Sequence, residues 1–103
     1  MGERQVNIAD PLFTLNSYNH TLRILVFLKG QTEAVNQTQV RNGVDVQNPQ
    51  TISNSLGALE DLGLVEIKTE LPRTNWITLT EKGEDAADHV IKIRELLTSD
   101  QRF

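Results

Sequence analysis

The sequence predicts a mainly α-helical fold with a small β-hairpin, of the α+β class, and three observations lead to it. Up to Gly63, apolar residues recur mostly at the three- and four-residue spacing of helices. Beyond Gly63, they form short strand-like runs separated by a polar loop, which is typical of a hairpin. After Thr80, helical spacing returns. The 103 residues are enough for one domain with a single modest core.

The N-terminal part predicts an irregular segment followed by a central helix. Residues 1–15 contain Asp10-Pro11, a turn signal. A helix is then expected from about Ser17 to Lys29, because Asn16 or Ser17 can cap it and Gly30 follows its last turn. Its broad apolar face makes this helix central to the core. That face consists of Tyr18, Leu22, Leu25, Val26 and Leu28.

The middle of the chain predicts a short helix and a longer helix joined by a tight turn. Glu33–Val35 forms at most a short strand. Asn36 then caps a helix over about Gln37–Asn42, and Asn48-Pro49 begins a second helix that ends at Gly63. The longer helix has one apolar side, formed by Ile52, Leu56 and Leu59. This pair of helices is the pattern of a helix-turn-helix unit.

The last third of the chain predicts a hairpin and a final helix. Leu64–Ile67 and Trp76–Leu79 predict two strands, with Glu70–Asn75 as the loop between them. Thr80 then caps a helix over about Glu81–Leu97. We expect one core in which Leu56, Leu59, Leu64 and Ile67 meet Leu22, Leu25 and Val40, joined by Trp76.

A hairpin directly after a helix-turn-helix unit is a wing. We therefore expect a winged helix-turn-helix DNA-binding domain over residues 16–80, preceded by the irregular segment 1–15 and followed by an added C-terminal helix in residues 81–103. Apolar residues of that helix recur at alternating gaps of four and three, like a coiled-coil seam. They are Ala86, Val90, Ile93 and Leu97, and they predict a dimerisation helix and a homodimer. Alternatively, this helix folds back onto Leu12, Phe13 and Tyr18.

The stretch from Asn36 to about Ala87 resembles the winged-helix regulators of the MarR and ArsR type. The resemblance covers about half the chain and rests on Leu56, Leu59, Gly63-Leu64-Val65 and Leu79-Thr80-Glu81-Lys82-Gly83. It implies a transcriptional regulator that binds double-stranded DNA, with the third helix of the domain in the major groove and the wing on the backbone or in the minor groove. The absence of Cys, independently, fits a reducing, cytoplasmic setting.

The candidate DNA-binding residues form three groups, and the alternative for each is an ordinary solvated surface. Gln50, Thr51, Ser53 and Asn54 lie on the first turns of the longer helix, where a recognition helix contacts base edges. Gln37 and Thr38 open the shorter helix, which approaches a phosphate in the family. Lys68 and Arg73 belong to the wing. Arg23 and Arg41 are weaker candidates for phosphate contacts.

The charge pattern keeps a second function open. The net charge is −4, and the segment Asn48–Gly63 contains Glu60 and Asp61 but no Lys or Arg. DNA-binding domains usually carry a basic surface, because most of their affinity comes from phosphates. The alternative is a winged helix that binds proteins within a transcription or replication complex. Convergence of Arg41, Lys68 and Arg73 around the longer helix would favour DNA.

Several other classes find no support in the sequence. The chain has no Cys and two His that are far apart, and it lacks nucleotide-binding and protease motifs, so we predict no catalytic residues, no metal and no cofactor. The longest apolar run, Ile24–Leu28, is too short for a membrane span. The N-terminus has no signal-peptide core.

Overall fold

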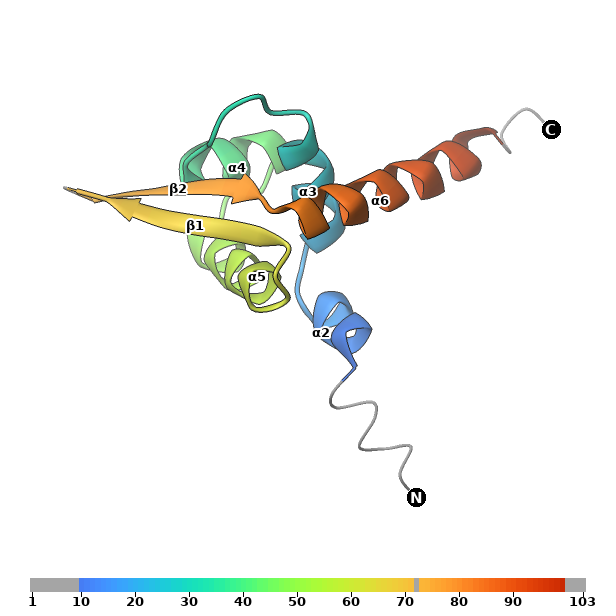
Figure 1. The fold of residues 1–103 in the computed structure, drawn as a ribbon, viewed down its shortest axis with the longest axis horizontal. Helices are drawn as coiled ribbons and strands as arrows, with labels where there is room; N and C mark the ends of the chain where they lie inside the picture. The colour runs from blue at the N-terminus through green and yellow to red at the C-terminus, as the bar shows by residue number, and fades with distance from the viewer. Residues whose placement is uncertain (1–9, 72, 100–103) are drawn as a thin grey trace, which may run out of the picture.

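The computed structural model describes residues 10–71 and 73–99 as a helical body with a projecting hairpin and a projecting last helix (Figure 1). The elements are α2 (Pro11–Ser17), α3 (Thr21–Lys29), α4 (Gln37–Val44), α5 (Pro49–Asp61), β1 (Val65–Glu70), β2 (Thr74–Leu79) and α6 (Glu81–Ser99). The predicted class, mainly α with a small hairpin, is confirmed. Among the described residues, no helix combines the length and apolar character needed to cross a membrane.

The N-terminal prediction is wrong in two respects. Helix α2 occupies part of the segment expected to be irregular, because the Asp10 side chain accepts a hydrogen bond from the Leu12 amide (2.9 Å) and Pro11 fits the first helical turn. The predicted helix from Ser17 is broken, and α3 begins only at Thr21, after His20 with a φ of 66°. Residues 1–9 of the predicted segment lie outside the described residues.

The two helices of the helix-turn-helix unit begin where the sequence predicts. At α4, Asn36 and Gln39 form a reciprocal capping box, each side chain accepting from the other's amide at 2.9 Å. At α5, Asn48 caps the helix and Pro49 occupies its first turn. Helix α4 continues past the expected end to Val44, because left-handed Asp45 (φ 60°) terminates it.

The hairpin is antiparallel and longer than predicted. Its register runs from Val65 opposite Leu79 to Glu70 opposite Thr74, so both strands extend into the expected loop. The predicted short strand before α4 is reduced to one bridge, between Val35 and Ile77. Their backbone groups exchange hydrogen bonds of 3.1 and 2.7 Å, which attaches the hairpin to the loop between α3 and α4.

The core lies between α3, α4, α5 and the base of the hairpin. Its buried members are Ile24, Leu25, Leu28, Val35, Val40, Val44, Ile52, Leu56, Leu59, Leu64, Val65, Ile77 and Ala87. Of the expected members, Ile67 is half-buried against this core, whereas Leu22 is 44% exposed and does not belong to it. Trp76 is not a core residue either. Ile77 takes the inward position on β2, so Trp76 faces outward, where its indole donates to Glu70 Oε1 at 2.7 Å.

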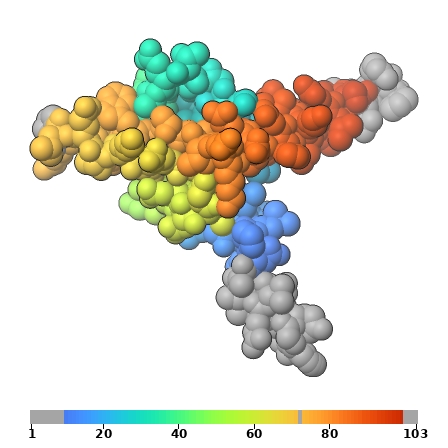
Figure 2. Space-filling model, viewed as in Figure 1, coloured from blue at the N-terminus to red at the C-terminus, as the bar shows by residue number. Residues whose placement is uncertain are grey.

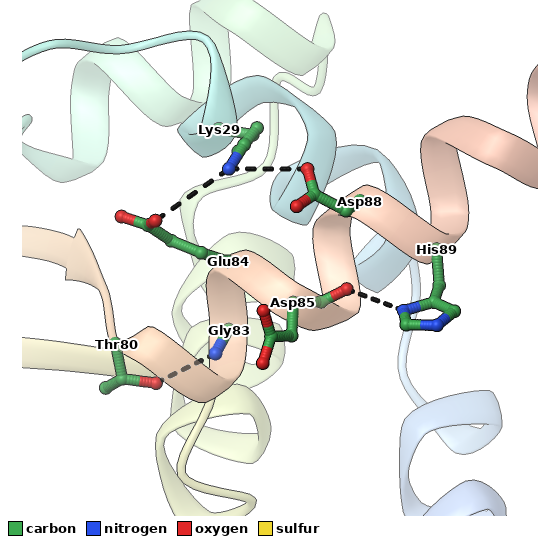
Figure 3. A network of polar contacts seen from close by, with 7 residues as sticks. All are labelled: Lys29, Thr80, Gly83, Glu84, Asp85, Asp88 and His89. Atoms are coloured by element: carbon green, nitrogen blue, oxygen red, sulfur yellow. Dashed lines mark hydrogen bonds and ion pairs between the residues drawn. The ribbon is translucent and has the colours of Figure 1, made fainter.

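The Gly63-Leu64-Val65 and Leu79-Thr80-Glu81-Lys82-Gly83 segments form the junction between α5, the hairpin and α6. The Thr80 hydroxyl donates to the Gly63 carbonyl (2.6 Å) and accepts from the Gly83 amide (3.0 Å), which caps α6 as predicted (Figure 3). Its backbone amide donates to the Leu64 carbonyl at 3.1 Å. A Cβ atom on Gly83 would overlap that same carbonyl oxygen. These residues therefore hold the end of α5 against the start of α6.

The first half of α6 packs on α3, and the second half leaves the body (Figures 1 and 2). Ala87 is buried, and Lys29 of α3 lies 3.8 Å from Glu84 and 3.3 Å from Asp88 (Figure 3). From Ile93 onward the apolar side chains of α6 are exposed. The alternative in which α6 folds back along its length onto the N-terminal segment is therefore wrong.

Candidate nucleic-acid interface

The turn between α4 and α5 is held by two side chains that the sequence suggested for phosphate binding. Gln37 is half-buried, and its amide donates to the Pro49 carbonyl at 2.9 Å. Arg41 donates through Nη1 to the Gln47 carbonyl at 3.1 Å. Both bonds fix the position of α5 relative to α4. Thr38, on the first turn of α4, remains exposed.

The candidate residues of α5 form one polar outer surface. Gln50, Ser53 and Asn54 are exposed and Thr51 is half-buried, whereas Ile52, Leu56 and Leu59 on the other side are buried in the core. The Gln50 side-chain amide donates to Asn54 Oδ1 at 2.8 Å. We call this hydrogen-bonded pair the amide pair. The core thus holds α5 while its polar side stays open to a partner.

Two further residues of α5 affect how the helix is held and what its polar side presents. Ser55 is buried, and its hydroxyl donates to the Asn19 carbonyl at 2.6 Å, which ties α5 to the segment between α2 and α3. Gly57 lies on the polar side one turn after the amide pair, and a Cβ atom there would meet nothing within 4 Å. The signal for Gly57 was present, because a glycine inside a helix costs stability and needs a reason.

The wing carries its candidate cations among acidic neighbours. Alternation along β1 puts Lys68 on the outer face with Glu66 and Glu70, and Lys68 lies opposite Trp76 in the register. Arg73 is exposed in the loop between the strands. Within residues 10–71 and 73–99, no hydrogen bond joins Lys68 or Arg73 to the polar residues of α5. In the described part of the chain, the wing cations are therefore not hydrogen-bonded to the polar side of α5, whereas Gln37 bonds to the first residue of that helix.

The candidate dimerisation residues fall into two groups. Ala86 and Val90 are half-buried against their own core, whereas Ile93 and Leu97 are 54% and 65% exposed. An apolar groove of about 620 Å³ lies between α2, α3 and the middle of α6. Its lining includes Leu12, Tyr18, Leu22, Val90 and Ile93, together with both histidines, His20 and His89. Apolar residues of α6 (Val90 and Ile93) and of the N-terminal part (Leu12, Tyr18 and Leu22) thus line one continuous groove.

No protein-family model and no curated protein matches the chain. Among solved structures, a possible HxlR family transcriptional factor from Thermoplasma volcanium matches with a TM-score of 0.74 and 21% identity, over 86% of this chain and 80% of that chain. A MarR family regulator from Silicibacter pomeroyi matches with a TM-score of 0.67 and 21% identity, over 86% of this chain. A variant of Staphylococcus aureus MepR bound to an oligodeoxyribonucleotide matches with a TM-score of 0.68 and 20% identity, over 81% of this chain.

The chain spans 56% of the length of the MarR family regulator and 62% of that of MepR. At this level of identity the likeness concerns the arrangement of the elements. The chain therefore has the winged helix-turn-helix fold of the HxlR and MarR family regulators.

Proposed function

We propose that this protein is a DNA-binding transcriptional regulator, with α5 in the major groove and the hairpin wing on the backbone or in the minor groove. The observation that carries the proposal is the exposed polar side of α5. The opposite side of the helix is buried in the core, and the side chains of Gln37 and Arg41 fix the turn before it through hydrogen bonds. Recognition helices present such N-terminal residues to base edges. A MepR variant with a similar fold is bound to an oligodeoxyribonucleotide, which supports DNA binding as the function.

The charge pattern implies that one protomer binds DNA weakly. Gln37 and Arg41 use donors within the turn, and Lys68 lies between Glu66 and Glu70 on β1. Thr38, the amides at the start of α4, Arg73 and the remaining guanidinium donors of Arg41 are the groups left for phosphates. Since each neutralised phosphate contributes to affinity and to its salt dependence, both should be small for a single copy.

We further propose that the protein binds DNA as a homodimer. Ile93, Leu96 and Leu97 are 54%, 66% and 65% exposed on a helix that leaves the body, and Leu12 and Phe13 are 66% and 58% exposed beside the groove. An apolar surface of this extent usually has a partner. A second copy offers the same surface in a two-fold arrangement, and it doubles the number of phosphate contacts.

The test is fluorescence anisotropy with labelled genomic fragments, including the gene's own promoter, at low and moderate salt. We expect saturable binding of at least one fragment with a salt slope that reflects few phosphate contacts. Asn54→Ala should change which fragments are preferred. Asn42→Ala, an exposed amide on α4, serves as the matched control and should not. Absence of binding to every duplex at low salt would contradict the proposal.

A second candidate is a winged helix that binds a protein partner. Two features favour it. Helix α5 contains no Lys or Arg, and acidic residues lie at its end and on the following strand, namely Glu60, Asp61, Glu66 and Glu70. In that case the anisotropy of no labelled duplex would rise during the titration. Asn54→Ala would then weaken capture of the partner from a cell extract, and the captured protein would rebind when purified.

A further inference from the structure

We propose that α5 selects an A·T base pair, with Asn54 contacting adenine and Gln50 holding the Asn54 amide in position. This inference rests on the proposed function and adds to it the class of base that the helix recognises. It depends on three observations: the chemistry of the amide pair, the residues that α5 lacks, and the open space at Gly57.

The amide pair retains the groups that adenine requires. In the major groove adenine presents N7 as an acceptor and N6 as a donor, and a carboxamide matches both at once. Asn54 Oδ1 accepts from Gln50 Nε2 at 2.8 Å, which uses one of its two lone pairs. The second lone pair and both Nδ2 hydrogens remain for N6 and N7. Because Gln50 already orients this amide, less side-chain freedom is lost on binding.

The rest of α5 lacks the side chains that read the other bases. Guanine is read mainly by Arg or Lys, and the segment Asn48–Gly63 contains neither. Cytosine is read by carboxylates. The two carboxylates of α5, Glu60 and Asp61, lie on its last turn, roughly 15 Å along the axis from Gln50 at 1.5 Å per residue. Among the side chains on the first two turns, amides and hydroxyls therefore determine the base contacts.

Gly57 provides an independent indication that a partner approaches this side closely. It lies at i+3 from Asn54, and its helical backbone has no neighbour that would exclude a Cβ. Packing within the chain therefore does not require glycine there. Because glycine has no side chain, the helix backbone beside Asn54 can come close to the edges of the bases. The short side chain of Asn54 can reach a base only at such a close approach.

The experiment is selection of bound duplexes from a randomised library, followed by atom-specific base replacement. The 103-residue chain should enrich sites with an A·T pair at a constant position. Replacing that adenine by 7-deazaadenine removes N7 but keeps base pairing. We expect wild-type affinity to fall about tenfold, within the range of one bidentate contact. Asn54→Ala should bind the normal and modified duplexes equally, and Asn42→Ala should respond like the wild type.

The positioning role of Gln50 has its own readout. Gln50→Met keeps the length of the side chain and removes its donor, so it should reduce the 7-deazaadenine effect without changing the selected base. In the Asn54→Ala background the same change should have no effect, since a residue that acts through Asn54 cannot act without it. Additive losses would overturn this role.

The outcomes separate this inference from the proposed function. Enriched sites with guanine at the Asn54-dependent position, or with no constant base there, would overturn the A·T assignment while leaving DNA binding intact. Failure to enrich any duplex would overturn both. The 7-deazaadenine measurement on the wild type does not depend on whether a variant folds. Thermal unfolding of each variant checks that the exposed substitutions leave the fold unchanged.

Discussion

At the scale of single residues, two glycines within helices occupy opposite environments. Gly83, in the first turn of α6, lies so close to the Leu64 carbonyl that a Cβ atom would overlap it. Gly57, in the middle of α5, has open space at the same position. Neither has a positive φ, so both can adopt the backbone of alanine. The same substitution therefore tests packing at one site and helix propensity at the other.

Gly83→Ala and Gly57→Ala should change stability in opposite directions. A methyl group at Gly83 would force α6 away from Leu64. Gly83→Ala should therefore lower the free energy of unfolding by ~1–3 kcal/mol, the typical cost of overpacking. Gly57→Ala should raise it by up to ~1 kcal/mol, the difference in helix propensity. Urea unfolding of the two variants and the wild type measures both. A destabilised Gly57→Ala would show that the fold requires glycine there.

The more stable Gly57→Ala should nevertheless bind DNA more weakly. The added methyl group projects from the recognition side next to Asn54, where it holds the helix away from the bases. Anisotropy titration with a selected duplex should show reduced affinity for Gly57→Ala and unchanged affinity for Asn42→Ala. Unchanged binding by Gly57→Ala would argue against close approach of DNA at this position.

At the scale of elements, α5 depends on its buried side. Leu59 is fully buried, whereas Leu71, at the end of β1, is 86% exposed. Leu59→Ala should lower the free energy of unfolding by ~2–5 kcal/mol, as expected for a buried leucine. Leu71→Ala, the matched control, should change it by less than ~0.5 kcal/mol. Equal urea midpoints for the two variants would contradict the buried position of α5.

The wing makes a different prediction, which concerns salt. Arg73 is exposed in the loop of the hairpin, and a phosphate contact there does not depend on base sequence. Arg73→Ala should weaken all duplexes alike and reduce the slope of log affinity against log salt by ~1 per protomer. Lys92→Ala, which removes an exposed cation from α6, should leave the slope unchanged. A slope that Arg73→Ala does not alter would exclude a phosphate contact by this residue.

At the scale of the whole molecule, the proposed homodimer depends on the exposed apolar side chains in the projecting half of α6. Ile93→Glu places a charge within the exposed apolar stripe and should convert the dimer into a monomer, as measured by sedimentation equilibrium. Affinity for a two-fold site should fall with it. Thr98→Glu adds the same charge at an exposed position outside the stripe and should remain dimeric. A wild type that is monomeric at high micromolar concentration would contradict the homodimer.

The starts of α4, α5 and α6 followed from the sequence because their causes are local. The capping box of Asn36 and Gln39, the Asn48-Pro49 start of α5 and the Thr80 cap of α6 each involve residues within three positions of one another. The change from helical to alternating spacing at Gly63 likewise predicted the hairpin. Together these signals determined the order of the elements from α3 to α6 and hence the winged helix-turn-helix fold.

The tertiary structure decided which polar and apolar residues are available to a partner. The sequence could not show that Gln37 would bond to the carbonyl of Pro49, that Leu22 would be exposed, or that Ala86 and Val90 would pack on their own core. The break at His20 also depends on how α2 and α3 pack, since Thr21 bonds to the carbonyl of Leu15. Helical and strand periodicity identifies the apolar side of each element. Which part of that side is covered depends on contacts between residues far apart in the chain.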